Sequence, residues 1–208
     1  MQRLQDDWIR KLSVAPFPLR TLLSELKDYS QPLFKVHQLV KSGVLYRLKR
    51  GFFCVNPEYS GVDNDVRVIA NSLYDAPSCI SLEFALSFYG LIPERVAGVT
   101  SVVTGRSKLF ETPIGWFRYQ KIPEKVFNIG VRSQNGYLIA SPEKALCDYI
   151  LTRRDLRIAS PKTMRSYLEE DVRFDFDAFE GYDPGIFKEY AASGIKADLF
   201  SALARLFQ

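Results

Sequence analysis

The sequence has a single histidine, His37, among its 208 residues. Metal sites that need two imidazoles, such as H-E-x-x-H, are therefore excluded, and a catalytic triad would have to use this one residue. We interpret His37, beside the inward face of a predicted helix, as a packing residue or a phosphate contact rather than a catalyst. The three cysteines, Cys54, Cys79 and Cys147, include no C-x-x-C pair and stand in apolar surroundings. We expect no disulfide framework, no metal and no cofactor.

Long hydrophobic runs are also missing. No apolar run reaches the roughly 18 residues of a membrane-spanning helix, and the opening MQRLQDDWIRKL mixes charged with apolar positions, unlike a secretory signal. We expect a cytoplasmic protein with no membrane contact. The motifs G-x-x-x-x-G-K-[ST], G-x-S-x-G and G-x-G-x-x-G are absent, and carboxylates cluster closely only at Glu169–Asp171. These absences predict a protein that is not an enzyme.

Positive charge is concentrated at the N-terminus, although the formal net charge is only +4. Residues 1–56 carry ten Lys and Arg against four Asp and Glu, which gives +6, whereas the rest of the chain carries 18 against 20. This distribution favours a polyanionic partner for the N-terminal part alone. The Pro, Gly, Asn and Asp residues of the segment 56–64 predict a boundary between two domains, residues 1–56 and 65–208.

The N-terminal domain is predicted to contain three helices and a hairpin. Apolar residues at helical spacing indicate a first helix through Leu4, Trp8 and Leu12, and a second one from Pro18 or Leu19. A third helix opens at Pro32, ends near Gly43, and turns Val36, Leu39 and Val40 inward. The run VLYRLKRGFFCV predicts a short basic hairpin closed by Gly51. This order of elements is typical of a winged helix-turn-helix, which binds double-stranded DNA.

The C-terminal domain is predicted to be mixed α/β, so that the whole chain belongs to the α+β class. Helices are expected at residues 65–73 and 80–89, and a third is opened by Ser141-Pro142. A small sheet of three strands and a helical tail complete it, with strands at 99–104, 116–121 and 137–140 and tail helices near 161–168, 184–192 and 197–207. Charged residues on apolar helices are expected to pair with strand backbone or with one another, namely Glu83, Glu143, Lys144 and Asp148.

Several segments together resemble the AbiEi antitoxins of type IV toxin–antitoxin systems. They are the wing LYRLKRGFFCV, the helix ISLEFALSFYGLIPE, the β segment VTSVVTGRSKLFETPIGWFRYQKI and the helix opening YLIASPEKALCDYI. The resemblance runs from about Leu19 to Leu151 and leaves the role of residues 153–208 unassigned. It implies a DNA-binding autorepressor of its own operator, whose C-terminal domain counters a nucleotidyltransferase-type toxin with or without direct contact.

The resemblance also implies which residues face DNA, when the DNA-binding positions of the family are matched to this sequence. These residues lie on the third helix, on the wing and at the start of the second helix. They are Arg20, Ser30, Gln31, Lys35, Gln38, Lys41, Arg47, Lys49 and Arg50. Wing cations would neutralise phosphates and release counterions, whereas Gln31, Lys35 and Gln38 have the donors and acceptors that read base edges.

Two alternatives stay open at this point. One is a winged-helix regulator whose C-terminal domain binds a small effector or a partner protein, with tyrosines and phenylalanines lining a pocket. The other is a metal-dependent enzyme that processes nucleic acid, with carboxylates of the second domain holding Mg²⁺.

Overall fold

The computed structural model describes residues 9, 12, 15–179 and 181–208. This part of the chain is of the predicted mixed α+β class, with helices and two β-sheets. None of the helices in these ranges is long and apolar enough to cross a membrane. The chain divides into two compact units: the first runs to Asp75 and includes Phe110–Trp116, and the second comprises Ala76–Leu109 and Phe117–Gln208.

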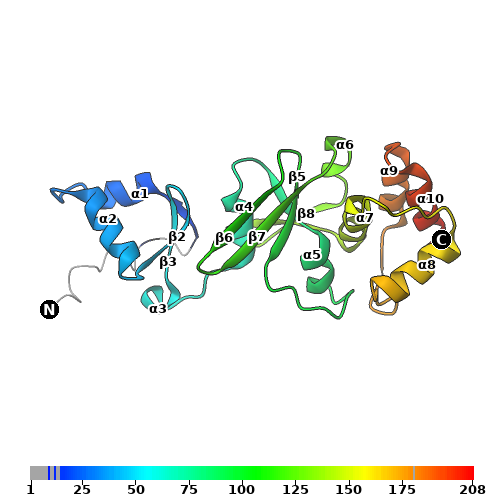
Figure 1. The fold of residues 1–208 in the computed structure, drawn as a ribbon, viewed down its shortest axis with the longest axis horizontal. Coiled ribbons are helices and arrows are strands. Elements are labelled where there is room, and N and C mark those ends of the chain that lie inside the picture. The colour runs from blue at the N-terminus through cyan, green and yellow to red at the C-terminus, as the bar shows by residue number, and fades with distance from the viewer. Residues whose placement is uncertain (1–8, 10–11, 13–14, 180) are drawn as a thin grey trace. The chain divides into compact units, whose positions relative to one another are not determined.

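The first unit combines short helices with a small sheet (Figure 1). In chain order its elements are β1 (Phe17–Pro18), α1 (Leu19–Glu25), α2 (Pro32–Lys41), β2 (Leu45–Lys49), β3 (Phe52–Val55), α3 (Pro57–Ser60) and α4 (Val66–Leu73). The strands follow the order β1-β3-β2 and pair antiparallel. The predicted second helix, third helix and hairpin are therefore present, while most of the predicted first helix, including Leu4 and Trp8, lies outside the described residues.

Apolar residues at helical spacing attach α1 and α2 to the small sheet. Leu22 and Leu26 of the α1 segment are completely buried, and Val36 and Leu39 form the inward side of α2. Full burial of such a side chain contributes about 1.5–3 kcal/mol. One continuous core results, which also contains Ile9, Phe17, Val44, Leu45, Phe53 and Val55.

The first unit extends past the predicted boundary. Residues 57–64 hold α3, which Asn56 caps through its side-chain oxygen, and the unit continues through α4 to Asp75. Lys49 of the hairpin forms a hydrogen bond and an ion pair that the sequence pattern did not indicate. Its ammonium donates to the Leu73 carbonyl at 2.8 Å and pairs with the carboxylate of Asp75. The hairpin and the end of α4 are thereby joined.

A six-stranded mixed sheet has the strand order β6-β7-β5-β4-β9-β8 and belongs to the second unit except for Phe110–Trp116, the end of β6 and the start of β7. Several of its strands are labelled in Figure 1. The pairs β4–β5 and β8–β9 are antiparallel, and β5–β7 and β4–β9 are parallel. The three predicted strands are present as β5 (Val99–Val103), β7 (Gly115–Lys121) and β9 (Tyr137–Ala140). Three strands were not predicted, namely β4 (Ser78–Ile80), β6 (Lys108–Thr112) and β8 (Val131–Gln134).

Helices of the second unit pack mainly on α7 and on the C-terminal helix. Their bounds are α5 (Leu82–Phe88), α6 (Glu124–Phe127), α7 (Pro142–Thr152), α8 (Pro161–Ser166), a π-helix η2 (Tyr167–Asp171), α9 (Pro184–Ala192) and α10 (Ala197–Leu206). Helix α7 packs against α5 and α9, and α10 against α8 and α9. The predicted N-cap of α7 is confirmed, since Ser141 Oγ accepts a hydrogen bond from the Lys144 N–H at 3.3 Å.

The helix predicted at residues 80–89 was placed too early, because Ile80 belongs to β4. The chain changes from strand to helix at Ser81 and Leu82, and Leu82 adopts φ +61 there. A left-handed leucine costs about 1–2 kcal/mol, which sequence periodicity cannot register.

An aromatic cluster closes the C-terminal part of the second unit. The rings of Phe187 and Phe207 stack with centroids 5.1 Å apart, and Phe179 stacks on Tyr182 at 5.2 Å. Phe174 meets Phe179 edge to face at 5.4 Å. Such pairs add roughly 0.5–1.5 kcal/mol each beyond the area they bury, so the acid-rich segment after η2 is fixed by aromatic contacts.

Gly130 fills a position where a side chain has no room. Its φ is +67, and an added Cβ would lie 2.9 Å from Lys144 Cβ and 3.0 Å from Ser141 Oγ. We expect Gly130→Ala to lower the free energy of unfolding by about 2–5 kcal/mol, because the left-handed backbone and the overpacking both cost energy. Urea unfolding followed by circular dichroism measures this change.

Gly136 provides the matched control. It also has a positive φ, +85, but no described atom lies within 4 Å of the place that an added Cβ would take. Gly136→Ala should therefore cost only the conformational part, about 1–2 kcal/mol. Equal losses for the two variants would contradict the packing argument for Gly130.

Candidate nucleic-acid interface

Helix α2 exposes a polar and basic side. Val36 and Leu39 are buried and determine which side faces the core. On the opposite side Gln38 and Lys41 are exposed, as predicted, and so is the N-cap residue Gln31. The helix contains no acidic residue, so no carboxylate on it opposes the approach of a polyanion.

Three further residues of α2 are exposed that the sequence prediction had not placed on this side. They are Leu33, Phe34 and His37. With 100° between successive residues, Phe34, His37 and Lys41 lie near the middle of the outward side. Leu33 and Lys35 lie at its two margins, where Leu33 is exposed and Lys35 is half-buried. The interpretation of His37 as a packing residue is therefore wrong, and its contact with phosphate stays a prediction.

Arg47 lies at the open edge of the small sheet, on β2. It is paired opposite Phe53, and opposite residues of an antiparallel pair point to the same face. Phe53 belongs to the core shared with α1 and α2, so Arg47 lies on the face of the sheet that the helices cover. Helix α2 packs against β2, and Arg47 is exposed. This geometry places a cation beside α2.

The tip of the β2–β3 hairpin carries a second exposed cation. Arg50 and Gly51 form a two-residue turn, in which Gly51 has φ +72, a conformation that glycine adopts without steric cost. The Gly51 carbonyl accepts a hydrogen bond from the Leu19 N–H at 2.8 Å, which ties the turn to the start of α1. Arg20, also exposed, follows directly. We call the exposed residues Gln31, Leu33, Phe34, His37, Gln38, Lys41, Arg47 and Arg50 the α2–hairpin surface.

Two predicted DNA contacts are engaged within the first unit. The side chain of Lys49 is only 19% exposed, and besides binding Leu73 and Asp75 its ammonium lies 5.4 Å from the centre of the Phe52 ring. The Lys35 ammonium lies 5.8 Å from the ring centre of Tyr29. Ser30, by contrast, is exposed just before α2.

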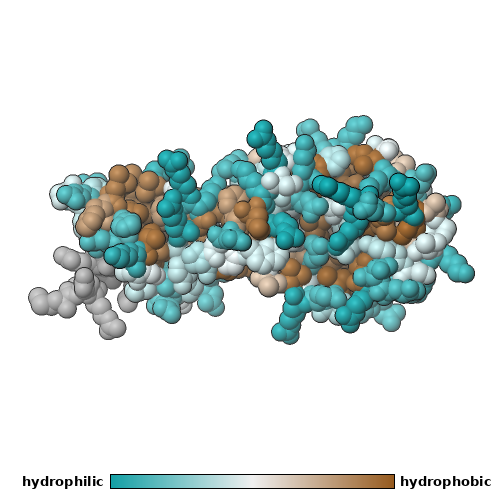
Figure 2. All heavy atoms as spheres, viewed as in Figure 1, coloured by the Kyte–Doolittle hydropathy of each residue, from teal (hydrophilic) through white to brown (hydrophobic). Residues whose placement is uncertain are grey.

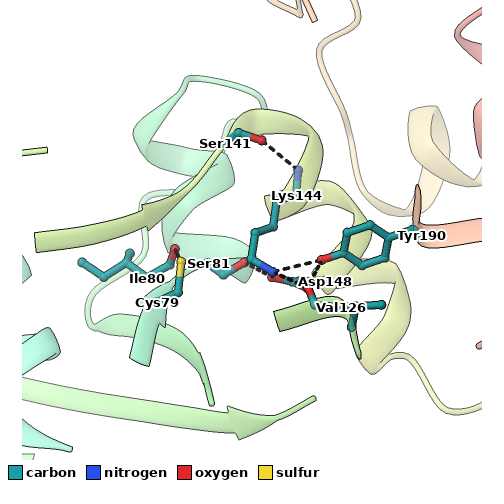
Figure 3. Close-up of polar contacts among 8 residues, drawn as sticks. All are labelled: Cys79, Ile80, Ser81, Val126, Ser141, Lys144, Asp148 and Tyr190. Atoms are coloured by element: carbon teal, nitrogen blue, oxygen red, sulfur yellow. Dashed lines mark hydrogen bonds and ion pairs between the residues drawn. The ribbon is translucent and has the colours of Figure 1, made fainter. Parts of the chain in front are cut away.

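The second unit contains a buried network of ionisable groups (Figure 3). Lys144 and Asp148, one turn apart on α7, form an ion pair at 3.2 Å, and both side chains are 0% exposed. The Lys144 ammonium also donates to the Val126 carbonyl at 3.1 Å and to the Tyr190 hydroxyl at 3.0 Å. Asp148 accepts from Ser81 Oγ and from the Tyr190 hydroxyl, each at 2.7 Å. Every charged atom of the pair is thus satisfied.

This network unites four parts of the second unit. Ser81 follows β4, Val126 lies on α6, the ion pair lies on α7, and Tyr190 lies on α9. The prediction that buried charges pair with one another is therefore confirmed for Lys144 and Asp148. The side chains of the network are all sealed from solvent, namely Ser81, Lys144, Asp148 and Tyr190. We therefore assign them to the stability and specificity of the fold rather than to chemistry on a substrate.

Burial also controls the protonation of other groups, both in this unit and in the first. It raises the pKa of the Cys79 thiol to about 12, and that of Cys54 to about 12, so both thiols stay protonated and unreactive at neutral pH. The pKa of the Tyr190 hydroxyl lies well above its usual value because of burial and the adjacent Asp148 carboxylate. Tyr190 therefore remains a hydrogen-bond donor to Asp148.

Glu83 and Glu143, the other two charged residues that were expected to pair, occupy different surroundings. Glu83 forms an exposed ion pair with Arg153 at 3.2 Å. Glu143 is buried, and its Oε1 accepts a hydrogen bond from the Asp183 N–H at 2.8 Å, which fixes the start of α9. Glu143 thus binds the backbone at a helix start and Glu83 binds Arg153, so, contrary to the prediction, neither pairs with strand backbone or with another of the four residues.

Among the described residues no three His, Cys, Asp or Glu side chains come together in a way that could hold a metal ion. The second unit has an open surface hollow of about 400 Å³, lined by Gly90, Pro93, Glu169, Arg173, Phe174 and Asp175. No protein-family model matches the chain, and a search of curated proteins finds no significant match.

Proposed function

We propose that this chain binds double-stranded DNA through the α2–hairpin surface and acts as a transcriptional regulator with a winged helix-turn-helix at its N-terminus. The observation that carries the proposal is the acid-free exposed side of α2 next to Arg47, on the helix-covered face of the small sheet. The order of α1, α2 and an antiparallel hairpin supports a helix in the major groove with the hairpin beside it.

Within this proposal the residues of the surface have different tasks. Lys41, Arg47 and Arg50, together with Arg20, neutralise phosphates and supply affinity that does not depend on sequence. Gln31 and Gln38 read base edges, because an amide both donates and accepts hydrogen bonds and pairs in a bidentate manner with adenine. Lys49 is left out of the contact set, since its ammonium is engaged by Leu73 and Asp75.

We further propose, on the resemblance to AbiEi antitoxins, that the DNA is the chain's own operator and that the second unit counters a nucleotidyltransferase-type toxin. Two of the four segments that carry the resemblance meet in the buried network, where Ser81 of ISLEFALSFYGLIPE donates a hydrogen bond to Asp148 of YLIASPEKALCDYI. Those residues therefore support the fold, and a surface acting against the toxin would be built from other, exposed residues.

The deciding experiment is binding of the purified chain to the DNA upstream of its own gene and to a scrambled duplex, at two salt concentrations. We expect specific binding whose affinity falls steeply with salt, because released counterions drive phosphate contacts. Equal, weak binding to both duplexes would contradict a regulator and favour a protein-binding role for the first unit.

Co-expression with the product of the adjacent gene tests the antitoxin proposal separately. If that product stops growth and the full chain restores it, a variant altered only at Lys41, Arg47 and Arg50 should restore growth as well. Failure of the wild-type chain to restore growth would contradict the antitoxin proposal and leave DNA binding untouched.

A further inference from the structure

Two large apolar side chains in the first turn of α2 face solvent. Leu33 is 63% exposed and Phe34 is 57% exposed, although the core of the same unit buries Leu22 and Leu26 completely. Figure 2 shows hydrophobic surface over the region of α1 and α2. Two neighbouring apolar side chains as exposed as these are a candidate contact for a partner.

The position of these side chains indicates which partner covers them. Phe34 shares the outward side of α2 with His37, Gln38 and Lys41, which lie three, four and seven residues further on. The apolar residues are therefore interleaved with amide and cationic groups, and no acidic residue lies on the helix. A partner that satisfies all of them must combine negative charge, hydrogen-bonding edges and small apolar groups.

The major groove of DNA has this combination of properties. Phosphates line it, base edges offer donors and acceptors, and the C5-methyl group of thymine is the apolar group that a base presents there. A phenyl ring and an isobutyl group have neither donors nor acceptors, so they gain from the methyl group and from no other feature of a base edge. A second copy of the chain fits less well, because two such surfaces would bring Lys41 and Arg47 of both copies together.

We propose that Phe34 and Leu33 read thymine methyl groups in the major groove, so that the preferred site has thymines where the first turn of α2 lies. This inference rests on the proposed DNA binding. The two apolar residues would then select sequence, while Lys41, Arg47 and Arg50 hold the backbone. Readout by methyl contact also leaves Gln38, one turn along, to specify the neighbouring base pair.

The test uses the full chain and duplexes selected from a random library by that chain. Each thymine of the selected duplex is replaced in turn by deoxyuridine, which removes the methyl group and keeps the hydrogen-bonding edge. For the wild-type chain we expect one or two positions at which the replacement weakens binding by about four-fold, the effect of losing one buried methyl group. Phe34→Ala or Leu33→Ala should abolish the difference between thymine and deoxyuridine at those positions.

Tyr59→Ala is the matched control, since Tyr59 is another exposed aromatic residue of the first unit, on α3, and is 45% exposed. It should keep the thymine preference intact. If the selected duplex binds but deoxyuridine is tolerated everywhere, or if both alanine variants keep the full preference, methyl readout is refuted while DNA binding stands. If Phe34→Ala converts a dimer into a monomer without changing the preference, the cluster serves self-association and methyl readout is again refuted. If no duplex is selected, the proposed function itself fails.

Discussion

Asp148→Ala is expected to lower the free energy of unfolding of the second unit by about 3–5 kcal/mol, because it strands the Lys144 ammonium in a sealed interior. In the native network Asp148 accepts hydrogen bonds from Lys144, Ser81 and Tyr190. Its removal leaves the ammonium with the Val126 carbonyl and a neutral hydroxyl. Urea unfolding followed by circular dichroism gives the change in free energy.

An exposed pair with the same spacing serves as the control. Arg165 and Glu169 also lie four residues apart, at 2.8 Å, but their side chains are 54% and 45% exposed. Glu169→Ala should cost at most about 0.5 kcal/mol, the usual value for a solvated pair on a helix. A loss at Asp148 no larger than this would show that water reaches the network and that its sealed geometry is wrong.

A double substitution separates the loss of a partner from the contribution of the pair. Lys144→Met combined with Asp148→Leu removes both charges and keeps similar volume, so no ion is left unpaired. We expect the double variant to recover at least half of the stability lost in Asp148→Ala, since well-packed apolar residues often replace a buried ion pair without loss. A double variant as unstable as the single one would mean that the shape of the network itself is required.

The elements that could be predicted from the sequence are those with strong local signals. Leucine spacing predicted α1, the proline at position 32 marked the start of α2, and Ser141 with its following proline marked the start of α7. The strands β6 and β8 lack such signals, because most of their residues are exposed and polar. They exist as strands through pairing with β7 and β9, which is a tertiary effect.

The charge of the candidate interface could be predicted from the sequence, but not the contacts and exposure of every residue in it. A polar, acid-free α2 followed by a basic hairpin is visible in the sequence, and Gln38, Lys41, Arg47 and Arg50 are exposed in the structure. Lys49 was assigned to DNA by its position on the wing, and no local pattern indicates its pair with Asp75, which lies 26 residues away. The exposure of Leu33 and Phe34 could not be predicted, because apolar residues in a helix are normally assigned to the core.

Removing three cations from the α2–hairpin surface should weaken DNA binding strongly. We expect the triple variant Lys41→Ala, Arg47→Ala, Arg50→Ala to lose about 10²-fold in affinity at about 0.1 M salt, because three phosphates are no longer neutralised. The slope of log affinity against log salt should also flatten by roughly three, one for each of those phosphates. Fluorescence anisotropy with the upstream duplex at several salt concentrations measures both quantities.

A variant of equal net charge decides whether position or charge matters. Lys125, Lys162 and Lys188 are exposed on the second unit, and their replacement by alanine removes the same three charges. This control should keep the full slope, because these three lysines are not in the proposed contact set and neutralise no phosphate there. If both triple variants lose the slope equally, the DNA senses the net charge of the chain and the α2–hairpin surface is not its binding site. If only the control loses it, the DNA binds the second unit.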